Sequence, residues 1–202
     1  MIATVEPPSW TAAANARNLA SAALRMTYQV RGHGVHHVGT SGPLLLVTRC
    51  EGVLAGALIH AMAPRPVHVV ANDAMNRAVP EKVLAAAGDI RLTGPGAILT
   101  QRRALAALRD DRAVVVAGAA APVGYLVGVS GVAVMPVVLL GAVGKVATDP
   151  PRPRSRIDVF FAPPVTVTVP GDPLRSDTRA AIAEQVRQIL ADAEALAGMR
   201  VV

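Results

Sequence analysis

The residues best suited to chemistry in this chain lie in one short polar segment. Arg49-Cys50-Glu51 interrupts the apolar run LLLVTRCEGVLAGAL at residues 44–58. A cysteine becomes a nucleophile when a cation, a base or a helix N-terminus lowers its pKa. Arg49 and the helix expected to follow offer two of these, whereas Glu51 opposes the thiolate. Two interpretations stay open, a thiol nucleophile and an inert, partly buried side chain, and the pattern favours the second.

The histidines offer two further groupings. His68 and Asp73 have the spacing of a catalytic pair, but they lie in a predicted strand, where residues five apart point to opposite faces. We interpret that spacing as a coincidence. His33, His36 and His37 are loosely spaced like metal ligands, but no cysteine or carboxylate lies nearby in the sequence to complete a site. The sequence predicts no metal and no cofactor.

Composition narrows the class of protein and of partner. The 202 residues are 52% hydrophobic and 17% charged, which suits one domain with a sizeable core. The net charge of +6 comes from 18 arginines and 2 lysines. The arginines are scattered and aromatic residues make up only 2%, so a base-stacking surface and a nucleic-acid partner are not expected. A basic chain can instead contact an anionic membrane.

The sequence also suggests a location. Cys50 is the only cysteine, which excludes an intrachain disulfide and fits a reducing compartment. The opening residues, MIATVEPPSW, lack the basic start and apolar run of a secretory signal. We therefore expect a cytoplasmic protein, with peripheral contact at the inner face of the membrane as a further option. A predicted helix at 10–27 either packs on the domain or lies on that membrane surface.

Apolar runs and helical periodicity predict alternating strands and helices. The expected strands are 43–48, 66–71, 113–117, 132–139 and 157–161, and the expected helices are 10–27, 52–62, 78–87, 98–109 and a C-terminal helix. This alternation predicts an α/β fold, a single domain with a largely parallel buried sheet flanked by helices. We expect residues 1–28 to form an N-terminal helical segment ahead of an α/β domain at 29–202.

Three local features refine that outline. Residues 31–34, RGHG, are expected to be a glycine-rich break before the first core strand, and 148–154 a surface loop. Gly198 is expected to cap the last helix. The apolar face of that helix is expected to consist of Ile182, Val186, Ile189, Leu190, Ala193 and Leu196.

One stretch competes with this outline. Residues 113–144 carry no charged side chain, so hydropathy alone would nominate a membrane span. The stretch also contains six glycines and two prolines, Pro122 and Pro136. Because such a sequence divides naturally into strand, small-residue helix and strand, we favour a buried core.

Five segments, taken in order, resemble the glycerolipid acyltransferase superfamily, whose best-known members acylate lysophosphatidic acid. They are VRGHGVHHVGTSGPLLLVTR, APRPVHVVANDAM, GDIRLTG, GVAVMPVVLLG and RIDVFFAPPVTV. The resemblance covers roughly residues 25–195. It implies a glycerolipid-acyltransferase-like fold and a place in phospholipid metabolism.

The chain differs from the family at the positions of the family's catalytic and phosphate-binding motifs. There the first core strand ends in a histidine that acts as general base, and an aspartate further along orients it. Aligned without gaps, the histidine falls on Cys50 and the aspartate on Ala55. The family's phosphate-contacting arginine falls on Gly94, and its later Glu-Gly-Thr-Arg motif falls near Gly118 and the alanines at 119–121.

The resemblance therefore implies a membrane-associated pseudoenzyme, acyltransferase-like but without an intact catalytic residue. Such a protein would bind an acyl chain, a lipid or a protein partner. The candidate ligand pocket consists of Arg49, Cys50, Glu51, Gly94 and Gly118. The alternative is an active acyltransferase that moves an acyl group from acyl-CoA or acyl carrier protein to a lysophospholipid or other glycerolipid with non-standard residues.

Overall fold

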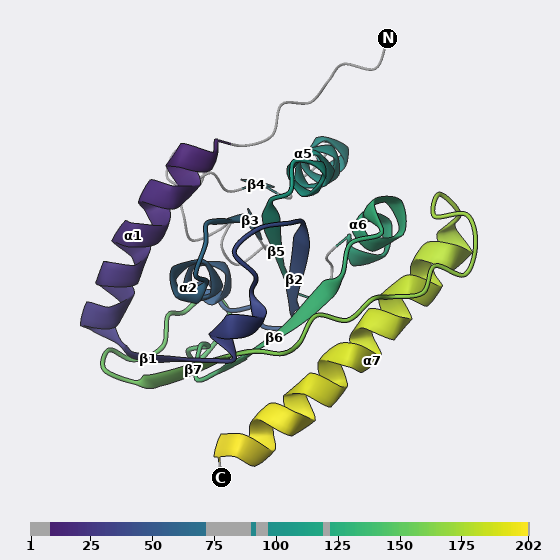
Figure 1. Ribbon diagram of the computed structural model, residues 1–202. Coiled ribbons are helices and arrows are strands. Elements are labelled where there is room, and N and C mark those ends of the chain that lie inside the picture. Colours follow the sequence, from purple (N-terminus) through teal and green to yellow (C-terminus); the bar gives the residue numbers. More distant parts are fainter. Residues whose placement is uncertain (1–8, 72–89, 92–96, 119–121, 202) are drawn as a thin grey trace.

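The chain folds around one sheet covered by helices on both faces (Figure 1). The computed structural model describes residues 9–71, 90–91, 97–118 and 122–201. Within them, seven strands follow the order β1-β7-β6-β2-β5-β3-β4. Neighbouring strands run parallel except β6 and β7, which are antiparallel. The expected α/β domain with a largely parallel buried sheet is confirmed.

The element boundaries follow the apolar runs closely. The strands are β1 (Gln29–His33), β2 (Leu44–Thr48), β3 (Val67–Ala71), β4 (Ile90–Arg91), β5 (Ala113–Ala117), β6 (Val134–Leu140) and β7 (Arg156–Phe161). The helices are α1 (Trp10–Thr27), the short 3₁₀ helix η1 (Val35–His37), α2 (Ala55–Met62), α5 (Ala97–Arg109), α6 (Val123–Ser130) and α7 (Ser176–Val201). All five expected strands are present within two residues of their expected bounds.

Two expectations about local structure differ from this result or lie outside it. Residues 31–33 belong to strand β1, which pairs in parallel with β7, so the expected glycine-rich break is wrong. An edge strand with polar residues and a glycine lacks the apolar run by which the others are recognised. The expected helix at 78–87 lies outside the described residues.

Strand β2 is the centre of the sheet. Its five residues are all buried, and so are the five of β5 beside it. Leu46 of β2 lies level with Val115 of β5 on one side and with Met135 of β6 on the other. A strand covered on both faces needs apolar side chains at every position, which explains the uninterrupted LLLV run.

Strand β6 changes partner half-way along. It pairs with β2 from Val134 to Pro136 and with β7 from Val137 onward. Pro136 has no backbone N–H, and it lies where the pairing changes from one strand to the other. Its carbonyl accepts from the amide of Ala162 (3.0 Å).

The charge-free stretch 113–144 contains β5, α6 and β6, so the expectation of a buried core is confirmed. Among the residues described, no helix combines the length and the apolar character that crossing a membrane requires.

Each face of the sheet has its own core. Helices α1 and α2 cover one face, against side chains such as Leu46, Met135 and Val159. Helices α5, α6 and α7 cover the other, against Leu45 and Val116 among others. Figure 1 shows the two layers on opposite sides of β2 and β5. The alternation of residues along each strand assigns each side chain to one of the two cores.

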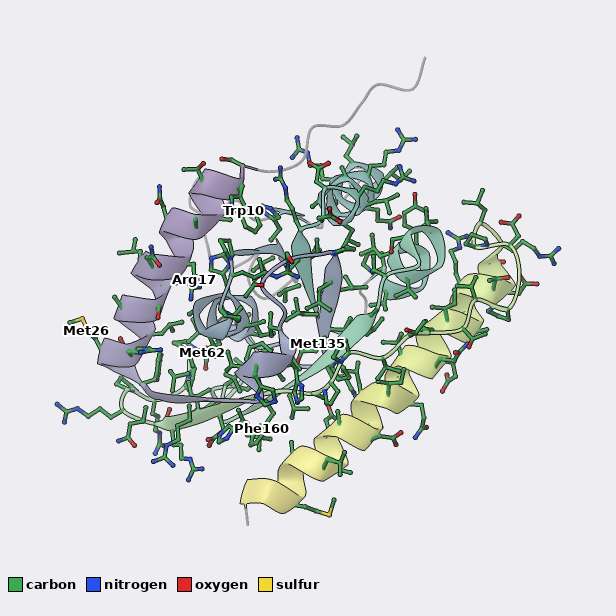
Figure 2. All side chains as sticks on the ribbon, in the orientation of Figure 1. Trp10, Arg17, Met26, Met62, Met135 and Phe160 are labelled. Atoms are coloured by element: carbon green, nitrogen blue, oxygen red, sulfur yellow. The ribbon has the colours of Figure 1, made fainter. Side chains whose placement is uncertain are left out.

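Polar contacts as well as apolar packing hold α1 on the sheet. Arg17 Nε donates to the carbonyl of Ala63 (2.8 Å), and Arg17 points from α1 toward α2 in Figure 2. His60 of α2 is buried between two backbone carbonyls. Its Nδ1 lies 2.6 Å from the oxygen of Val67, and its Nε2 lies 2.9 Å from that of Ala13. The imidazole therefore links α1 to the start of β3.

The last helix differs from expectation at its end. Gly198 is expected to cap it, but α7 continues to Val201 through that glycine. Leu196 is 57% exposed, so it is not on the buried face, where Ala193 and Ala197 are the last buried positions. Ala193 and Ala197 are one helical turn apart, and their small side chains let the helix approach Val138 and Phe160.

The setting of His60 predicts a pH dependence of stability. Burial lowers the pKa of His60, more than the two carbonyl contacts raise it. The unfolded chain, with an ordinary histidine pKa of about 6.5, therefore binds the proton more readily. Stability is complete above about pH 6.5 and is lost as the pH falls toward the lower pKa of the folded state.

Accordingly, the difference in unfolding free energy between the wild type and His60→Gln should shrink as the pH falls from about 7.5 to about 5. Denaturant titrations at several pH values measure this difference. The exposed His36 provides a matched control, and His36→Gln should show no such change. A difference that grows toward acid pH would mean that the ring is charged in the folded protein, contrary to this account.

Candidate functional site

The polar segment found in the sequence begins at the carboxyl end of the central strand. The amide of Gly118, just after β5, donates to the carbonyl of Thr48 at the end of β2 (2.9 Å). Gly118 has a φ of 94°, a conformation that favours glycine. The carboxyl edge of parallel strands is where α/β proteins usually bind ligands. Cys50 and Gly118, both expected pocket residues, thus lie at the ends of neighbouring strands.

Arg49 turns away from this edge. Its Nη1 lies 3.0 Å from Oε2 of Glu194 on helix α7, and both side chains are partly exposed. Arg49 is therefore engaged in a surface ion pair. Such a pair contributes little to stability, and it directs the cation toward α7.

Cys50 lies in an environment that keeps its thiol protonated. Its amide donates to Oγ1 of the buried Thr48 (3.2 Å), which fixes the turn after β2. Burial raises the pKa of Cys50, the charge of Glu51 raises it further, and a backbone contact at Gly52 only partly offsets them. In the part of the chain that is described, no histidine forms a hydrogen bond with Cys50. These surroundings are the opposite of those that activate a nucleophile.

The loop after β6 closes over the next residues. A Cβ at the buried Gly52 would lie 2.9 Å from the carbonyl oxygen of Ala142 and 3.2 Å from a methyl of Val143. The amide of Val53 donates to the carbonyl of Ala147 (2.9 Å). The loop after β6 therefore packs against the residues that follow Cys50.

The expected orienting position is part of the core. Ala55, the first residue of α2, has no exposed surface. A carboxylate there would lose its hydration, so it would need a hydrogen-bonding or charged partner. Gly94 and the alanines at 119–121, where the phosphate contacts of the family are expected, lie outside the described residues.

A histidine–carboxylate pair does exist, but elsewhere in the fold. His33 Nε2 at the end of β1 lies 2.9 Å from Oδ1 of Asp158 on β7, and the His33 ring stacks on Phe160 with centroids 4.2 Å apart. Arg156 Nε donates to the other oxygen of Asp158 (2.6 Å). Burial raises the pKa of Asp158, but the contacts with Arg156 and His33 outweigh it and leave that pKa below its ordinary value. The carboxylate is thus ionised and holds the imidazole in place.

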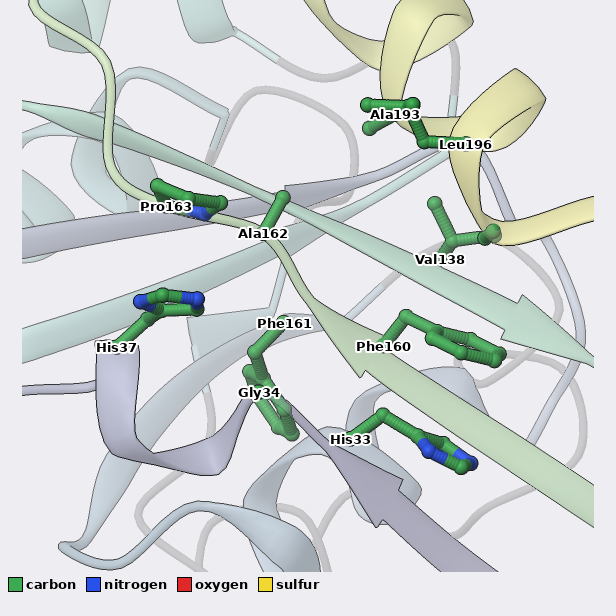
Figure 3. A pocket seen from close by; sticks show the side chains of 11 residues that line it. His33, Gly34, His37, Val138, Phe160, Phe161, Ala162, Pro163, Ala193 and Leu196 are labelled. Carbon is green, nitrogen blue, oxygen red and sulfur yellow. The ribbon is translucent and has the colours of Figure 1, made fainter. Parts of the chain in front are cut away.

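This pair borders a small apolar pocket beneath the end of α7 (Figure 3). The pocket has a volume of about 120 Å³. His33 and His37 are its polar residues, and Val138, Phe160, Pro163 and Leu196 provide much of its apolar lining. Ala193 and Leu196 of α7 lie on the side of the pocket opposite His37 in Figure 3.

The sequence alone draws attention to only one member of this histidine–carboxylate pair. His33 is noticeable there as part of the trio with His36 and His37, but its partner Asp158 lies 125 positions away. The alternation of Arg156, Asp158 and Phe160 along β7 places all three on one face, but only the pairing of β1 with β7 brings His33 to them. The rings of His36 and His37 lie 4.1 Å apart. Within the described ranges, no three potential ligands come together to hold a metal.

The comparisons with known proteins point to the same fold. No protein-family model matches the sequence, and no curated protein is significantly similar to it. A solved structure does match, the 1-acyl-sn-glycerophosphate (LPA) acyltransferase PlsC from Thermotoga maritima. The match has a TM-score of 0.58 and covers 88% of this chain and 78% of that one. The chain has the acyltransferase fold.

The identity to PlsC is 14%, so the likeness is one of fold. It confirms the architecture that the sequence resemblance implied. The roles of individual residues depend on the geometry of this chain.

The surroundings of Cys50 predict slow thiol chemistry. Because its pKa is raised, alkylation of Cys50 by iodoacetamide at neutral pH should be slower than that of a free cysteine in the unfolded chain, and should speed up only at more alkaline pH. Mass spectrometry of timed samples measures the rate, with the denatured protein as the control. Alkylation faster than in the denatured chain would show an activated thiolate.

Proposed function

We propose that this chain is an acyltransferase-fold protein of lipid metabolism that has lost catalysis and retains the binding of an acyl chain or other apolar ligand. The observation that carries this proposal is the position after the central strand, where a protonated Cys50 stands in place of a base. Ala55 is buried in the core where an orienting carboxylate would be required. A protein partner at the same surface is the other form that such binding could take.

The loss of catalysis follows from the chemistry of acyl transfer. A hydroxyl attacks an acyl carbonyl efficiently only when a base removes its proton, and a positioned base contributes about 10²- to 10⁴-fold. A thiol with a raised pKa is a poor base, and the backbone of Ala142 lies against the adjoining Gly52. In this proposal, the position at Cys50 offers no proton acceptor for the hydroxyl, and the loop after β6 packs close beside it.

The pocket under α7 is the best candidate for an apolar chain. Its walls are mainly aliphatic and aromatic, and each CH₂ buried there contributes about 0.8 kcal/mol. Pockets for whole small molecules are typically about 300–1,000 Å³, so this one would hold a segment of a chain and leave the rest at the surface. Leu196, exposed at its rim, extends the apolar surface outward.

Peripheral contact with an anionic membrane belongs to the same proposal. The net charge of +6 favours a negatively charged surface. Helix α1 exposes Leu19 and Met26, which gives it some apolar surface to present to lipid. At the cytoplasmic face of the membrane, the protein would be close to the lipids whose acyl chains it is proposed to bind.

A second candidate function is supported by the His33–Asp158 pair. A buried carboxylate 2.9 Å from Nε2 leaves Nδ1 of His33 to accept a proton. In an active acyltransferase, Nδ1 would take the proton of the acceptor hydroxyl while the hydroxyl oxygen forms a bond to the thioester carbon. The C–S bond then breaks, and the leaving thiolate takes up that proton. This chemistry would occur on the face covered by α7, away from Cys50.

The first proposal predicts no turnover. Purified protein should not transfer an acyl group from acyl-CoA or acyl carrier protein to a lysophospholipid, as followed by release of the free thiol. Cys50→Ala and His33→Gln should therefore leave the background rate unchanged. Turnover that survives Cys50→Ala and is lost in His33→Gln, with His36→Gln as the control, would establish the second candidate. Turnover lost in Cys50→Ala would identify a thiol nucleophile instead.

The first proposal also predicts a ligand preference. Fatty acid should bind more tightly than lysophosphatidate, because the pocket under α7 is lined mainly by aliphatic and aromatic side chains, which solvate a phosphate poorly. Leu196→Asp at the pocket rim should weaken fatty-acid binding, whereas Leu19→Asp on the exposed side of α1 should not. Calorimetry with monomeric ligand measures both, and mass spectrometry of co-purified lipid provides an independent check. Tighter binding of lysophosphatidate would contradict the proposal.

A further inference from the structure

The loop between β6 and β7 carries a surface that the acyl-chain pocket does not use. In residues 141–155, Val143 is 47% exposed and Val146 is 55% exposed. Lys145 lies between them and is also exposed. Two aliphatic side chains that flank a cation at the surface need an explanation, because the loop has no apolar neighbour that covers them.

The backbone of this loop is held on both sides. The carbonyl of Ala147 accepts from Val53 at the start of the α2 segment (2.9 Å). The amide of Arg154 donates to the carbonyl of Thr27 at the end of α1 (2.7 Å), and Tyr28 Oη donates to the carbonyl of Pro151 (3.3 Å). The loop is therefore anchored to the domain at both ends, and its valines are presented to solvent from a fixed backbone.

Basic residues predominate in this loop and at the end of α1, to which the loop is hydrogen-bonded. Arg152 and Arg154 of the loop and Arg25 of α1 are exposed, while Asp149 is the only acidic residue between 141 and 155. Met26, next to Arg25, is 88% exposed and points away from the sheet in Figure 2. We call this set the basic loop surface: Arg25, Met26, Val143, Lys145, Val146, Arg152 and Arg154.

An open groove of about 630 Å³ runs along this surface. Lys145, Arg152 and Arg156 lie on its walls, with Val143 beside them. Asp158 balances the charge of Arg156, and the carboxylate of Asp149 also lines the groove. Lys145 and Arg152 together outweigh the charge of Asp149, so the groove keeps a net positive charge that would attract a phosphate headgroup.

We propose that the basic loop surface docks the protein on an anionic phospholipid bilayer. The cations would contact phosphate headgroups, while Val143, Val146 and Met26 would enter the region just below them. Nucleic acid would meet the cations but leave the aliphatic side chains unused, and no aromatic residue of this surface could stack on a base. A protein interface would be expected to include aromatic anchors such as tryptophan or tyrosine, whereas the apolar residues of this surface are aliphatic.

This inference deepens the peripheral membrane contact of the proposed function by assigning it to one surface. It is independent of whether the pocket under α7 binds an acyl chain. Binding of monomeric fatty acid without vesicles therefore tests the pocket, and binding of vesicles tests the basic loop surface.

The test is co-sedimentation of the full chain with vesicles of phosphatidylcholine alone or mixed with phosphatidylglycerol. Binding should require the anionic lipid and should weaken between about 0.1 M and about 1 M salt, where screening shortens from about 10 Å to about 3 Å. Each cation near an anionic surface is worth about 1 kcal/mol, so the double variant Lys145→Gln, Arg152→Gln should bind about thirty-fold more weakly.

Matched variants distinguish an effect of this surface on vesicle binding from an effect of the protein's net charge. Arg102→Gln with Arg103→Gln removes the same charge from exposed positions of α5, which lies at the far side of Figure 1 from the end of α1, and should leave binding close to wild type. Val143→Ser with Val146→Ser should weaken binding even at low salt.

Equal losses in the loop and α5 charge variants would overturn the proposal, and so would a wild-type protein that ignores anionic vesicles. Binding of a DNA duplex as tight as that of anionic vesicles, and unchanged by the valine variants, would identify a general polyanion surface and also overturn it.

Discussion

The pairing of β2 with both of its neighbours is the constraint on which the rest of the structure depends. Leu46 lies between Val115 and Met135, so this strand can neither shift nor twist independently of β5 and β6. A parallel strand buried on both faces specifies its register through its side chains, because a shift by one residue would exchange the two cores. With β2 fixed, the turn at Thr48 and Cys50 is fixed as well. The acyltransferase fold can therefore persist whatever residue type stands at Cys50.

This separation explains why the fold was easier to predict than the site. The uninterrupted apolar runs of β2, β5 and β6 are typical of buried strands, so these strands could be predicted from the sequence. The glycines and prolines of the charge-free stretch allowed its division into strand, helix and strand to be predicted. The sequence pattern did not predict strand β1, because an edge strand that contains Arg31 and Gly32 lacks the apolar run by which the buried strands are recognised. The site depends on contacts between distant residues. The pairs Arg49–Glu194 and His33–Asp158 span 145 and 125 positions, and no local pattern predicts either partner.

The surroundings of Cys50 are those of a structural residue. Cys50 is partly buried, its pKa is raised, and the neighbouring Gly52 lies against the backbone of the loop after β6. Each of these features favours packing over solvent access. Polar side chains with possible functions lie at two other places. One is the face of the sheet covered by α7, where Asp158 holds His33 beside an apolar pocket, and the other is the basic loop surface. The proposed chain binding and the proposed membrane contact therefore involve different parts of one fold.

A crystal structure of the protein with a bound fatty acid tests the central claim most directly. That claim is that apolar ligands bind beneath α7 and not at the edge of the sheet beside Cys50. The account predicts the chain between β7 and α7, in contact with Phe160 and Leu196, with the turn at Gly52 unchanged. A chain whose carboxyl group faces the Cys50 sulfur, with the loop at Ala142 and Val143 displaced, would contradict it.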